Sequence, residues 1–338
     1  MRVLITGGAG HVGTPITKRF ADRGWDVRVI GVDPTCDLAG VTYSQCDILD
    51  CEALQDHVAG CDAIVHLAAI PSTISHPNHA LFETNVAGTY NVFEAAERAG
   101  VKRIAQASSI NALGGYWGCD DRQFEYFPLD EAHPLHTTDA YSFSKQLLEE
   151  IAAYYWRRSG ISSVSFRLPA VWSDDLIEER QLRGHLGEKR EAVDEFRKLP
   201  QDEQRRQVAA AREAALKLRA RHVMEYEAAQ AGGFDRYAPA DDWLFSSYFF
   251  DRFNYWTFIH TDDSTQAFER AITADFSGAH PLFVNSDRNY LDYDSEALLA
   301  IFFPDVPGRS KAIAGAQALV SYDRARDLLG YEATVHVV

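Results

Sequence analysis

The first thirty residues place an apolar, β-branched run directly before a glycine-rich turn and a helix-like segment. RVLITGGAGHVG carries glycines at positions 7, 8, 10 and 13, and TPITKRFADRGW follows with apolar residues at helical spacing. A strand, a glycine turn and a helix in this order are typical of a dinucleotide-binding fold. Gly7 permits the tight turn, Gly10 allows the main chain to approach a pyrophosphate, and Gly13 allows close helix packing. The sequence therefore predicts a cofactor site whose phosphates face the N-terminus of the first helix.

The second predicted strand, WDVRVIG, is followed by an acidic residue. Asp33 comes just after this strand, and an acid here usually accepts hydrogen bonds from the adenosine ribose, which favours NAD over NADP. The signal is blurred, because Gly31 stands where the acid is expected. No Lys or Arg follows immediately, so we expect NAD, with NADP as the alternative. Asp47 and Ile48 in QCDILD are candidates to hold the adenine, although an ordinary strand end has the same spacing.

Strand-like and helix-like segments alternate along much of the remaining chain. Apolar strands are predicted at 61–71, 101–109 and 161–172, and helices at 79–100 and from residue 140 onward. This alternation predicts an α/β fold of the Rossmann type, a doubly wound parallel sheet with ligands at the carboxyl ends of its strands. The residues at such ends include Ala68, Ala69, Ser108 and Ser109. His66 lies inside an apolar strand and is expected to be a packed core histidine.

Changes of composition divide the chain into three parts. Residues 1–174 form the expected NAD(P)-binding part, 175–233 a charged helical insertion, and 234–338 a smaller substrate-binding part that returns to the core. In the insertion we predict two helices separated near Leu199-Pro200. Opposite charges at helical spacing indicate a solvated face, with a lid or an oligomerisation arm as alternatives. The aromatic run 241–260 is predicted to be buried core or a subunit interface rather than a sugar-stacking wall.

The charge balance and the cysteines restrict the compartment and the partners. The formal net charge is −16 and the pI is about 5.1, which argues against nucleic acid or an anionic membrane as a partner. No apolar run approaches the ~20 residues of a membrane span, and MRVLITGGAG shows no signal-peptide pattern. The five cysteines include no CxxC pair, so we expect reduced thiols in the cytoplasm and no metal site.

A series of motifs extends along nearly the whole chain. In order, they are TGGAGHVG, CDILD, VHLAA, NVAGTYNVFEAA, ASSINALGG, PLDEAHPLHTTDAYSFSK, FRLPAVW, TFIHTDDSTQAFERAI and YDRARDLLGYE. Together they resemble the extended short-chain dehydrogenases/reductases, the NAD-dependent epimerase/dehydratase group. Many motifs in the right order are far more specific than any single one. The resemblance implies the same Rossmann-type fold, NAD(P) as cofactor, and a cofactor site that also includes His11, Val12, Leu67, Ala68, Ala69 and Pro169.

The resemblance identifies YSFSK with the catalytic YxxxK of this group. The fragment alone is also explained by an aromatic residue, Tyr141, at a helix edge beside a solvated Lys145. In the family, this tyrosine removes a proton from a substrate hydroxyl while hydride leaves the same carbon for the nicotinamide. A free tyrosine has a pKa near ~10, so Lys145 and the oxidised nicotinamide are expected to lower it, and Lys145 also holds the nicotinamide ribose. The resemblance implies that Ser109 hydrogen-bonds the reacting oxygen of the substrate, with Ser108 as the alternative. Asn85 shapes the central helix and its water chain, or is a purely structural amide.

Departures from the family pattern bear on the substrate. The 4,6-dehydratases carry an Asp-Glu pair where this chain has Ser109-Ile110, so sugar dehydration is not expected. The diphosphate-clamping loop of nucleotide-sugar epimerases is replaced by the charged insertion. Trp256-Thr257 stand where an arginine commonly precedes the FIH strand, which further weakens the case for a nucleotide sugar. ASSINALGGYWG and the short route to TDAYSFSK resemble the uronate dehydrogenase-like branch, which oxidises free sugars.

The leading hypothesis is an NAD(P)-dependent oxidoreductase acting on a secondary alcohol or ketone of a carbohydrate-like small molecule. An epimerase that keeps NAD bound is the alternative. A third hypothesis is a cofactor-sensing protein without chemistry, against which the joint presence of Ser109, Tyr141 and Lys145 argues. A homodimer or a higher homo-oligomer is expected.

Overall fold

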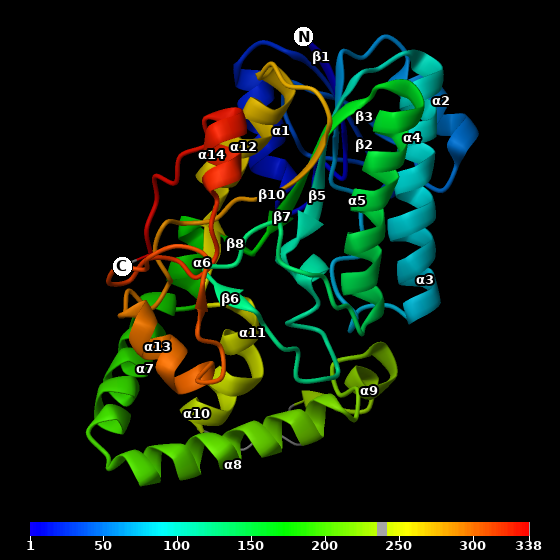
Figure 1. Ribbon diagram of the computed structural model, residues 1–338. Helices are drawn as coiled ribbons and strands as arrows, with labels where there is room; N and C mark the ends of the chain where they lie inside the picture. Colours follow the sequence, from blue (N-terminus) through cyan, green and yellow to red (C-terminus); the bar gives the residue numbers. More distant parts are fainter. Residues whose placement is uncertain (235–241, 338) are drawn as a thin grey trace.

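The centre of the computed structural model is a seven-stranded sheet in the order β10-β7-β5-β4-β1-β2-β3 (Figure 1). The structure describes residues 1–234 and 242–337. The strands are β1 (Arg2–Thr6), β2 (Asp26–Gly31), β3 (Thr42–Gln45), β4 (Ala63–His66), β5 (Arg103–Ser109), β7 (Ser162–Leu168) and β10 (Ala279–Phe283). Every neighbouring pair is parallel. The strand order reverses between β1 and β4, which in doubly wound sheets marks the ligand crevice. The predicted α/β fold of the Rossmann type is confirmed.

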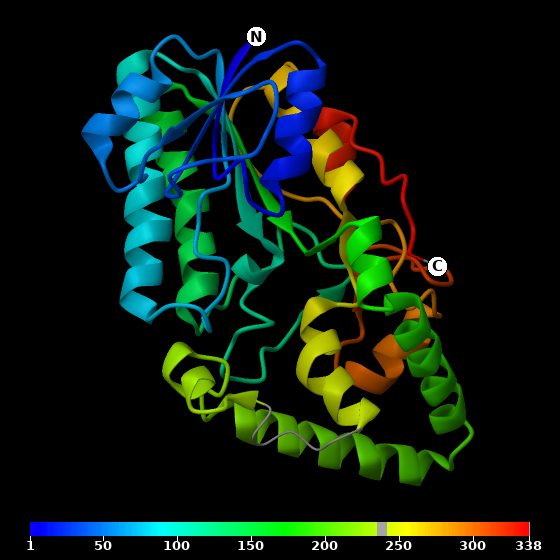
Figure 2. The same cartoon turned by 180° about the vertical axis from the view of Figure 1, so that it is seen from behind.

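Helices cover both faces of the sheet (Figures 1 and 2). One layer consists of α1 (Gly13–Asp22), α12 (Thr261–Thr273) and α14 (Asp323–Leu329), and the other of α2 (Cys51–Val58), α4 (Gly88–Ala99) and α5 (Ala140–Ser159). Side chains alternate along β1, so Val3 and Ile5 join the core beneath the first layer and Leu4 joins the core beneath the second. This burial on both sides explains the continuous apolar runs of the strands.

The helix predicted at 79–100 is present, and its middle is widened. It consists of α3 (Asn78–Phe82), the π-helical turn η1 (Glu83–Ala87) and α4, and it ends at Gly100 with a φ of 76°. This left-handed conformation suits glycine because residues with a side chain rarely adopt a positive φ. Single π turns often occur at functional sites.

Two predicted strands are shorter than expected. The strand predicted at 61–71 stops at His66. The Leu67 N–H still donates to the Thr6 carbonyl oxygen at 3.0 Å, and the N–H groups of Leu67 and Ala68 also reach the Thr6 hydroxyl, at 3.2 Å each. The strand predicted at 161–172 is broken at Pro169, which has no N–H to continue a ladder. Beyond the break, β8 (Ala170–Trp172) pairs with β9 (Phe258–His260) instead.

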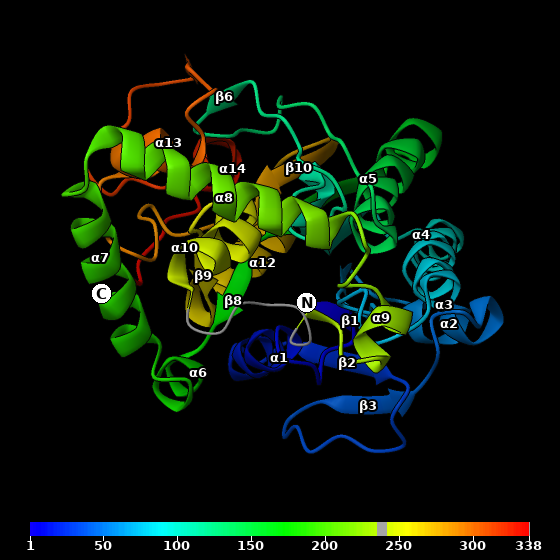
Figure 3. The same cartoon turned by 90° about the horizontal axis from the view of Figure 1, so that it is seen from below.

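The charged segment forms an arm that runs along one end of the molecule (Figures 1 and 3). It contains α6 (Asp174–Glu179), α7 (Leu182–Arg197), α8 (Gln201–Arg219) and α9 (Tyr226–Gln230), with the two long helices separated at Leu199 and Pro200. Its outer side carries exposed ion pairs such as Arg206–Glu203. The prediction of a solvated face holds only for that side. The inner side of α8 is buried through Ala211, Ala215, Leu218 and Arg219.

The aromatic run packs beneath this arm. It contains α10 (Trp243–Ser246), the π turn η4 (Ser247–Asp251) and α11 (Arg252–Asn254), and residue 241 lies outside the described part of the chain. Phe249, Tyr255 and Trp256 are completely buried, as expected for core residues. The remaining elements are η2 (Ile110–Leu113), β6 (Tyr126–Phe127), α13 (Ser295–Phe302) and β11 (Gly308–Arg309). Among the described residues, none of the helices combines the length and apolarity that crossing a bilayer requires.

Candidate active site

A cavity of about 500 Å³ lies at the carboxyl ends of β4, β5 and β7. One side is formed by residues from the loops after these strands and from the glycine turn, namely Val12, Leu67, Ala69, Pro71, Leu168, Pro169, Ala170 and Val171. The floor carries Ala107, Ser108, Ser109, Tyr141 and Lys145. The outer side is formed by Ile110, Asn111, Tyr116, Trp117, Trp172, Phe250, Asp251, Asn254 and Tyr290. The structure thus brings together Val12, Leu67, Ala69, Ser109, Tyr141, Lys145 and Pro169 of the predicted site.

The glycine turn packs against the end of β4 as the sequence predicts. Gly7 has a φ of 69°, and a β-carbon on it would lie 2.8 Å from the main-chain nitrogen of Ala68. A β-carbon on Gly13 would lie 2.5 Å from the carbonyl oxygen of Gly7, and Gly10 donates its N–H to the same oxygen at 3.1 Å. Side chains are therefore excluded where a dinucleotide phosphate must approach the main chain.

Tyr141 and Lys145 lie in the first turns of α5, and both are buried. Asp139 caps the helix by accepting a hydrogen bond from the Ser142 N–H at 2.8 Å. The Lys145 ammonium donates to the carbonyl oxygen of Ala107 at the end of β5, at 2.7 Å, and lies 5.6 Å from the centre of the Tyr141 ring. The interpretation of Lys145 as a solvated surface residue is wrong, because only 3% of it is exposed.

Burial shifts both groups away from their charged forms. It raises the pKa of Tyr141 to about 12, against a hydrogen bond with the Ser109 hydroxyl that favours the phenolate. It lowers the pKa of Lys145 to about 8, so the ammonium persists at neutral pH. The expected lowering of the Tyr141 pKa is therefore not a property of the chain alone, because desolvation outweighs the hydrogen bond with Ser109. A further positive charge beside the ring is needed to make the phenol a base.

The two serines at the end of β5 have different partners. The Ser109 oxygen accepts hydrogen bonds from the Asn111 main chain at 3.1 Å and from its amide at 3.3 Å, and the hydroxyl pairs with Tyr141. Ser108 lines the cavity too, but its hydroxyl donates to Glu149 at 2.7 Å. Ser109 is therefore the serine whose proton can face a reacting oxygen.

Asn85 does not line the cavity, and its side chain is fully engaged. Its amide nitrogen donates to the Ile70 carbonyl at 3.0 Å and to the Ser144 hydroxyl at 3.1 Å, while its oxygen accepts from the Ile70 N–H at 2.8 Å. It thereby joins the loop after β4 to the turn of α5 that carries Lys145. Of the two roles considered, this geometry favours a structural amide that positions the site.

Eight predicted cofactor residues do not line the cavity, namely Gly7, Gly10, His11, Gly13, Asp33, Asp47, Ile48 and Ala68. The His11 ring bonds the Val171 carbonyl at 2.9 Å. Asp33 is exposed after β2, and its main-chain oxygen accepts from the Tyr43 hydroxyl at 2.5 Å. The Asp47 carboxylate accepts from the Leu49 N–H at 2.9 Å, and Ile48 is 3% exposed. Asp33 is thus available to a ribose, whereas Ile48 presents little surface to an adenine.

The outer side of the cavity contains residues that the sequence did not reveal. Asp251 is buried there and accepts hydrogen bonds from Tyr290 at 2.7 Å, from Ser247 at 2.9 Å and from Lys189 of α7. One signal was present: a carboxylate inside an aromatic run must have partners, because an unpaired buried charge is very costly. Those partners are distant in sequence and could not be named from it.

The arm also holds the loop that carries Tyr116 and Trp117. Arg219 of α8 donates to the carbonyl oxygens of Gly115 at 3.1 Å and Gly118 at 2.7 Å, and also to that of Phe249. Its guanidinium lies 3.9 Å from the ring centre of Phe253. The insertion is therefore built into the outer side of the site.

The chain matches the model of the NAD dependent epimerase/dehydratase family over residues 3–213. It belongs to this family. Curated relatives include the uronate dehydrogenases of Pseudomonas putida, 33% identical over 169 residues, and of Agrobacterium fabrum, 34% identical over 168 residues. Each match covers 49% of this chain and 60% of the relative, so the chain spans less than two thirds of either.

Solved structures of the family share the fold. A short-chain dehydrogenase/reductase superfamily protein from Agrobacterium tumefaciens with bound NAD has a TM-score of 0.62 at 20% identity, covering 100% of this chain and 94% of that one. Uronate dehydrogenase from the same organism has a TM-score of 0.58 at 19% identity, covering 99% and 85%. At such identities the likeness concerns the fold alone.

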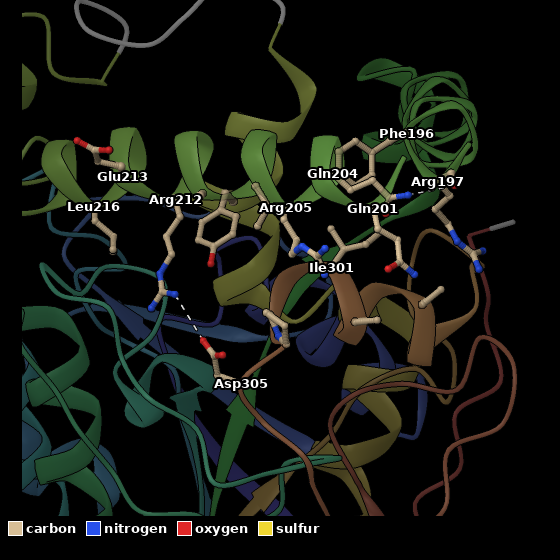
Figure 4. A pocket seen from close by; sticks show the side chains of 16 residues that line it. Phe196, Arg197, Gln201, Gln204, Arg205, Arg212, Glu213, Leu216, Ile301 and Asp305 are labelled. Atoms are coloured by element: carbon tan, nitrogen blue, oxygen red, sulfur yellow. Dashed lines mark hydrogen bonds and ion pairs between the residues drawn. The ribbon is translucent and has the colours of Figure 1, made fainter. Parts of the chain in front are cut away.

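A larger cavity of about 810 Å³ lies away from the family's motifs, between α8 and α13 (Figure 4). Phe196, Val208, Leu216 and Ile301 give it apolar walls. Arg212 is paired with Asp121 and lies 3.6 Å from Asp305 across the opening (Figure 4). None of the family's Ser, Tyr or Lys residues reaches this space, so we assign the chemistry to the smaller cavity. Among the described residues, there is no group of three His, Cys, Asp or Glu side chains that could hold a metal.

His66 should make stability fall in acid. Its ring bonds the hydroxyls of Thr6 at 2.7 Å and Thr89 at 3.0 Å, and burial lowers its pKa from 6.5 to about 3. Between these values the unfolded chain binds the proton and the folded chain does not, so the free energy of unfolding decreases as pH falls. The limiting slope is about 1.4 kcal/mol per pH unit. Urea unfolding between pH 7 and pH 4 gives the free energy of unfolding as a function of pH. This free energy should fall less steeply for His66→Gln than for the wild type, and equal slopes would contradict the role of His66 in acid sensitivity.

Proposed function

We propose that this chain is an NAD-dependent oxidoreductase that transfers hydride between the nicotinamide and a secondary alcohol or ketone of a sugar or sugar-like molecule. The carrying observation is the arrangement on the cavity floor, where the Tyr141 phenol pairs with Ser109 and Lys145 is fixed beside it by Ala107. The names of the curated relatives, among them an L-arabinose 1-dehydrogenase of Haloferax volcanii, support a sugar as substrate.

The residues present fit a dinucleotide. At Gly7, Gly8 and Gly13 a β-carbon would clash with neighbouring atoms, and Gly10 carries no side chain, so the main chain of the turn can approach phosphates. Bound NAD would supply the hydride acceptor and, when oxidised, a positive charge near the floor. Lys145 would hold the nicotinamide ribose while keeping its bond to Ala107. The reacting carbon of the substrate would then lie near Tyr141.

In the forward direction, Ser109 holds the substrate oxygen and Tyr141 takes its proton. The carbon–hydrogen bond breaks with its electron pair leaving as hydride, and a carbonyl forms at that carbon. In reverse, Tyr141 gives the proton back to the alkoxide. The phenol of the free chain, with its pKa raised to about 12, is a weak base at neutral pH. Proton removal is therefore expected only when the cofactor's positive charge is present.

Formation of NADH in proportion to oxidised sugar tests this function. An increase in NADH absorbance when free sugars are added would support the dehydrogenase function. An epimerase is the second candidate, because the relatives include the UDP-glucose 4-epimerase of Bacillus subtilis. An epimerase would interconvert sugars without net formation of NADH. Binding of NAD with neither outcome would favour the cofactor-sensing hypothesis.

NAD is expected to bind more tightly than NADP. Asp33 is exposed after β2, and Tyr43 fixes its main chain, so its carboxylate can accept ribose hydroxyls and would repel a 2′-phosphate. Titration of both dinucleotides by protein fluorescence measures the preference. Asp33→Asn should narrow it, and tighter NADP binding by the wild type would mean that the ribose is recognised elsewhere.

We propose a homodimer built on the α4–α5 layer. Four large apolar side chains are exposed on these helices, namely Tyr90, Phe143, Tyr154 and Trp156, and Phe82 of α3 is exposed beside Phe143. Large exposed apolar side chains on neighbouring helices support a contact surface. Light scattering that gives the monomer mass would contradict it.

Five free cysteines are compatible with the cytoplasm as the compartment.

We also propose that the division at 175 and 233 separates functions. On this view residues 1–174 bind the cofactor, whereas 175–233 and 234–338 supply the substrate side. Lys189 and Arg219 of the arm support the proposal: Lys189 bonds Asp251 of the outer side, and Arg219 bonds Gly115 and Phe249, the chain neighbours of the lining residues Tyr116 and Phe250. The last residue, 338, and residues 235–241 lie outside the described part of the chain.

A further inference from the structure

The outer side of the catalytic cavity offers hydrogen bonds and aromatic rings but no free cation. Among the described residues that line the cavity, Asp251 is the one acidic side chain, and Lys145 is the one Lys or Arg. The Lys145 ammonium is already held by Ala107 at 2.7 Å on the floor, where the proposed function gives it the nicotinamide ribose. A substrate carboxylate or phosphate would find no unassigned positive partner in this lining.

The Asp251 carboxylate is held by three donors. Tyr290 donates to Oδ1, while Ser247 and Lys189 both donate to Oδ2. Two carboxylate oxygens can accept about four hydrogen bonds, so Oδ1 has one place left. Asp251 and Tyr290 both line the cavity, whereas Lys189 approaches from α7 behind them. Because Asp251 lines the cavity, a ligand there could use the remaining acceptor position on Oδ1.

Aromatic rings complete this surface. Tyr116, Trp117, Trp172 and Phe250 line the same side, and Tyr116 and Trp117 are in edge-to-face contact at 5.0 Å. Such rings bury the apolar C–H faces of a small molecule while its hydroxyls reach polar groups at the edge. The combination of a hydroxyl acceptor with aromatic walls suits a polyhydroxylated, uncharged molecule.

Building on the function proposed above, we propose that the substrate is an uncharged sugar, one hydroxyl of which donates to Asp251, and that this residue discriminates against sugars bearing a carboxylate or phosphate. Two negative groups a few ångströms apart repel each other strongly where water is scarce. Lys189 is a positioning residue, since it orients and partly neutralises Asp251 without lining the cavity.

The proposed preference for an uncharged sugar differs from the substrate class that the relatives' name, uronate dehydrogenase, indicates, because a uronate carries a carboxylate. The matches to those relatives cover 49% of this chain. The family model ends at residue 213, before Asp251 and Tyr290. Likeness in the matched part therefore does not extend the relatives' substrate to this cavity.

Matched sugar pairs test the proposal with the full chain. The NAD complex is titrated with D-glucose against D-glucuronate and D-galactose against D-galacturonate, using tryptophan fluorescence for binding and NADH absorbance for turnover. In each pair the uncharged sugar should bind at least about tenfold more tightly. Equal or tighter binding of either uronate, or no binding of any uncharged sugar including L-arabinose, overturns the proposal. Charge-selective binding without NADH would instead contradict the proposed function and leave this inference standing.

Two variants isolate the charge. Asp251→Asn keeps the shape but removes the acceptor charge, so binding of the uncharged sugar should fall by about ten- to a hundredfold. The same change leaves Lys189 unpaired, so the uronate-to-aldose affinity ratio should rise. Lys189→Gln should move this ratio the opposite way. Lys198→Gln, at the end of the same helix with an exposed pair to Glu195, is the control and should change neither. An unchanged ratio in both test variants that retain NAD binding overturns the role of Asp251.

Discussion

Replacing Tyr141 with phenylalanine is expected to lower turnover by about 10²- to 10⁴-fold while leaving NAD affinity close to that of the wild type. The ring fills the same space, and the change removes the one hydroxyl that pairs with Ser109 on the cavity floor. No second phenol takes its place, because Tyr116 and Tyr290 lie on the outer side, and the hydroxyl of Tyr290 is bonded to Asp251. Steady-state NADH formation with a verified sugar, beside a fluorescence titration of NAD, measures the two effects separately.

The matched control is Tyr154→Phe on the same helix. Its hydroxyl accepts only from Arg158, at 3.0 Å, and the residue is 37% exposed. This variant should turn over normally. A Tyr141→Phe enzyme within a few-fold of the wild-type rate would remove Tyr141 from the chemistry. Loss of NAD binding would show that the phenol serves the cofactor rather than the substrate proton.

The second large effect is expected on stability, from Arg219→Met. Methionine retains much of the apolar stem but removes the guanidinium donor from the carbonyl oxygens of Gly118 and Phe249. The Gly115 carbonyl loses Arg219 too, but it keeps the Gly118 N–H at 3.2 Å. Each buried acceptor left unpaired costs about 1–3 kcal/mol. Relief from burying a charge offsets part of this, since desolvation lowers the pKa of Arg219 to about 9. We expect the free energy of unfolding to fall by about 2–4 kcal/mol.

Urea denaturation measures this change, with Arg206→Met as the control. Arg206 lies on the exposed side of α8, pairs with Glu203 and is 75% exposed at its side chain, so its replacement should cost little. The loop with Tyr116 and Trp117 loses its anchor in the Arg219 variant, and KM for the sugar should therefore rise as well. Equal stability of the two variants would show that α8 is not held through Arg219.

Local patterns predicted the parts of the site that lie close together in sequence. The glycine turn and the Tyr141–Lys145 spacing each depend on one short segment, so their residues were identifiable before the fold was known. Asp251 and Lys189 meet only through tertiary packing, across 62 positions of sequence. Arg219 resembled every other arginine of a charged helix, because charge periodicity does not reveal which single arginine finds buried carbonyls. The solvated-face prediction for the insertion was half wrong for this reason.

The predicted strand ends shifted for equally specific reasons. An apolar run indicates burial and does not show where the hydrogen bonds between strands end. The sequence therefore could not show that the strand stops at His66, or that the Thr6 hydroxyl accepts from the N–H groups of Leu67 and Ala68. Pro169 was a visible signal of a break, and the strand prediction over 161–172 passed over it. The pKa of Tyr141 also needed the structure, since burial and not a neighbouring residue determines its direction.

The position of β10 at the edge of the sheet limits how this chain can be divided or exchanged with segments of related proteins. A gene truncated after residue 174 would encode six of the seven strands, with the free edge of β7 bare and without α12 and α14 over one face. Exposed strand edges and uncovered apolar faces favour aggregation. The cofactor-binding segment should therefore not survive as an independent fragment. Chimeras that exchange substrate preference must carry β10, α12 and α14 with the exchanged piece, or leave all three in place.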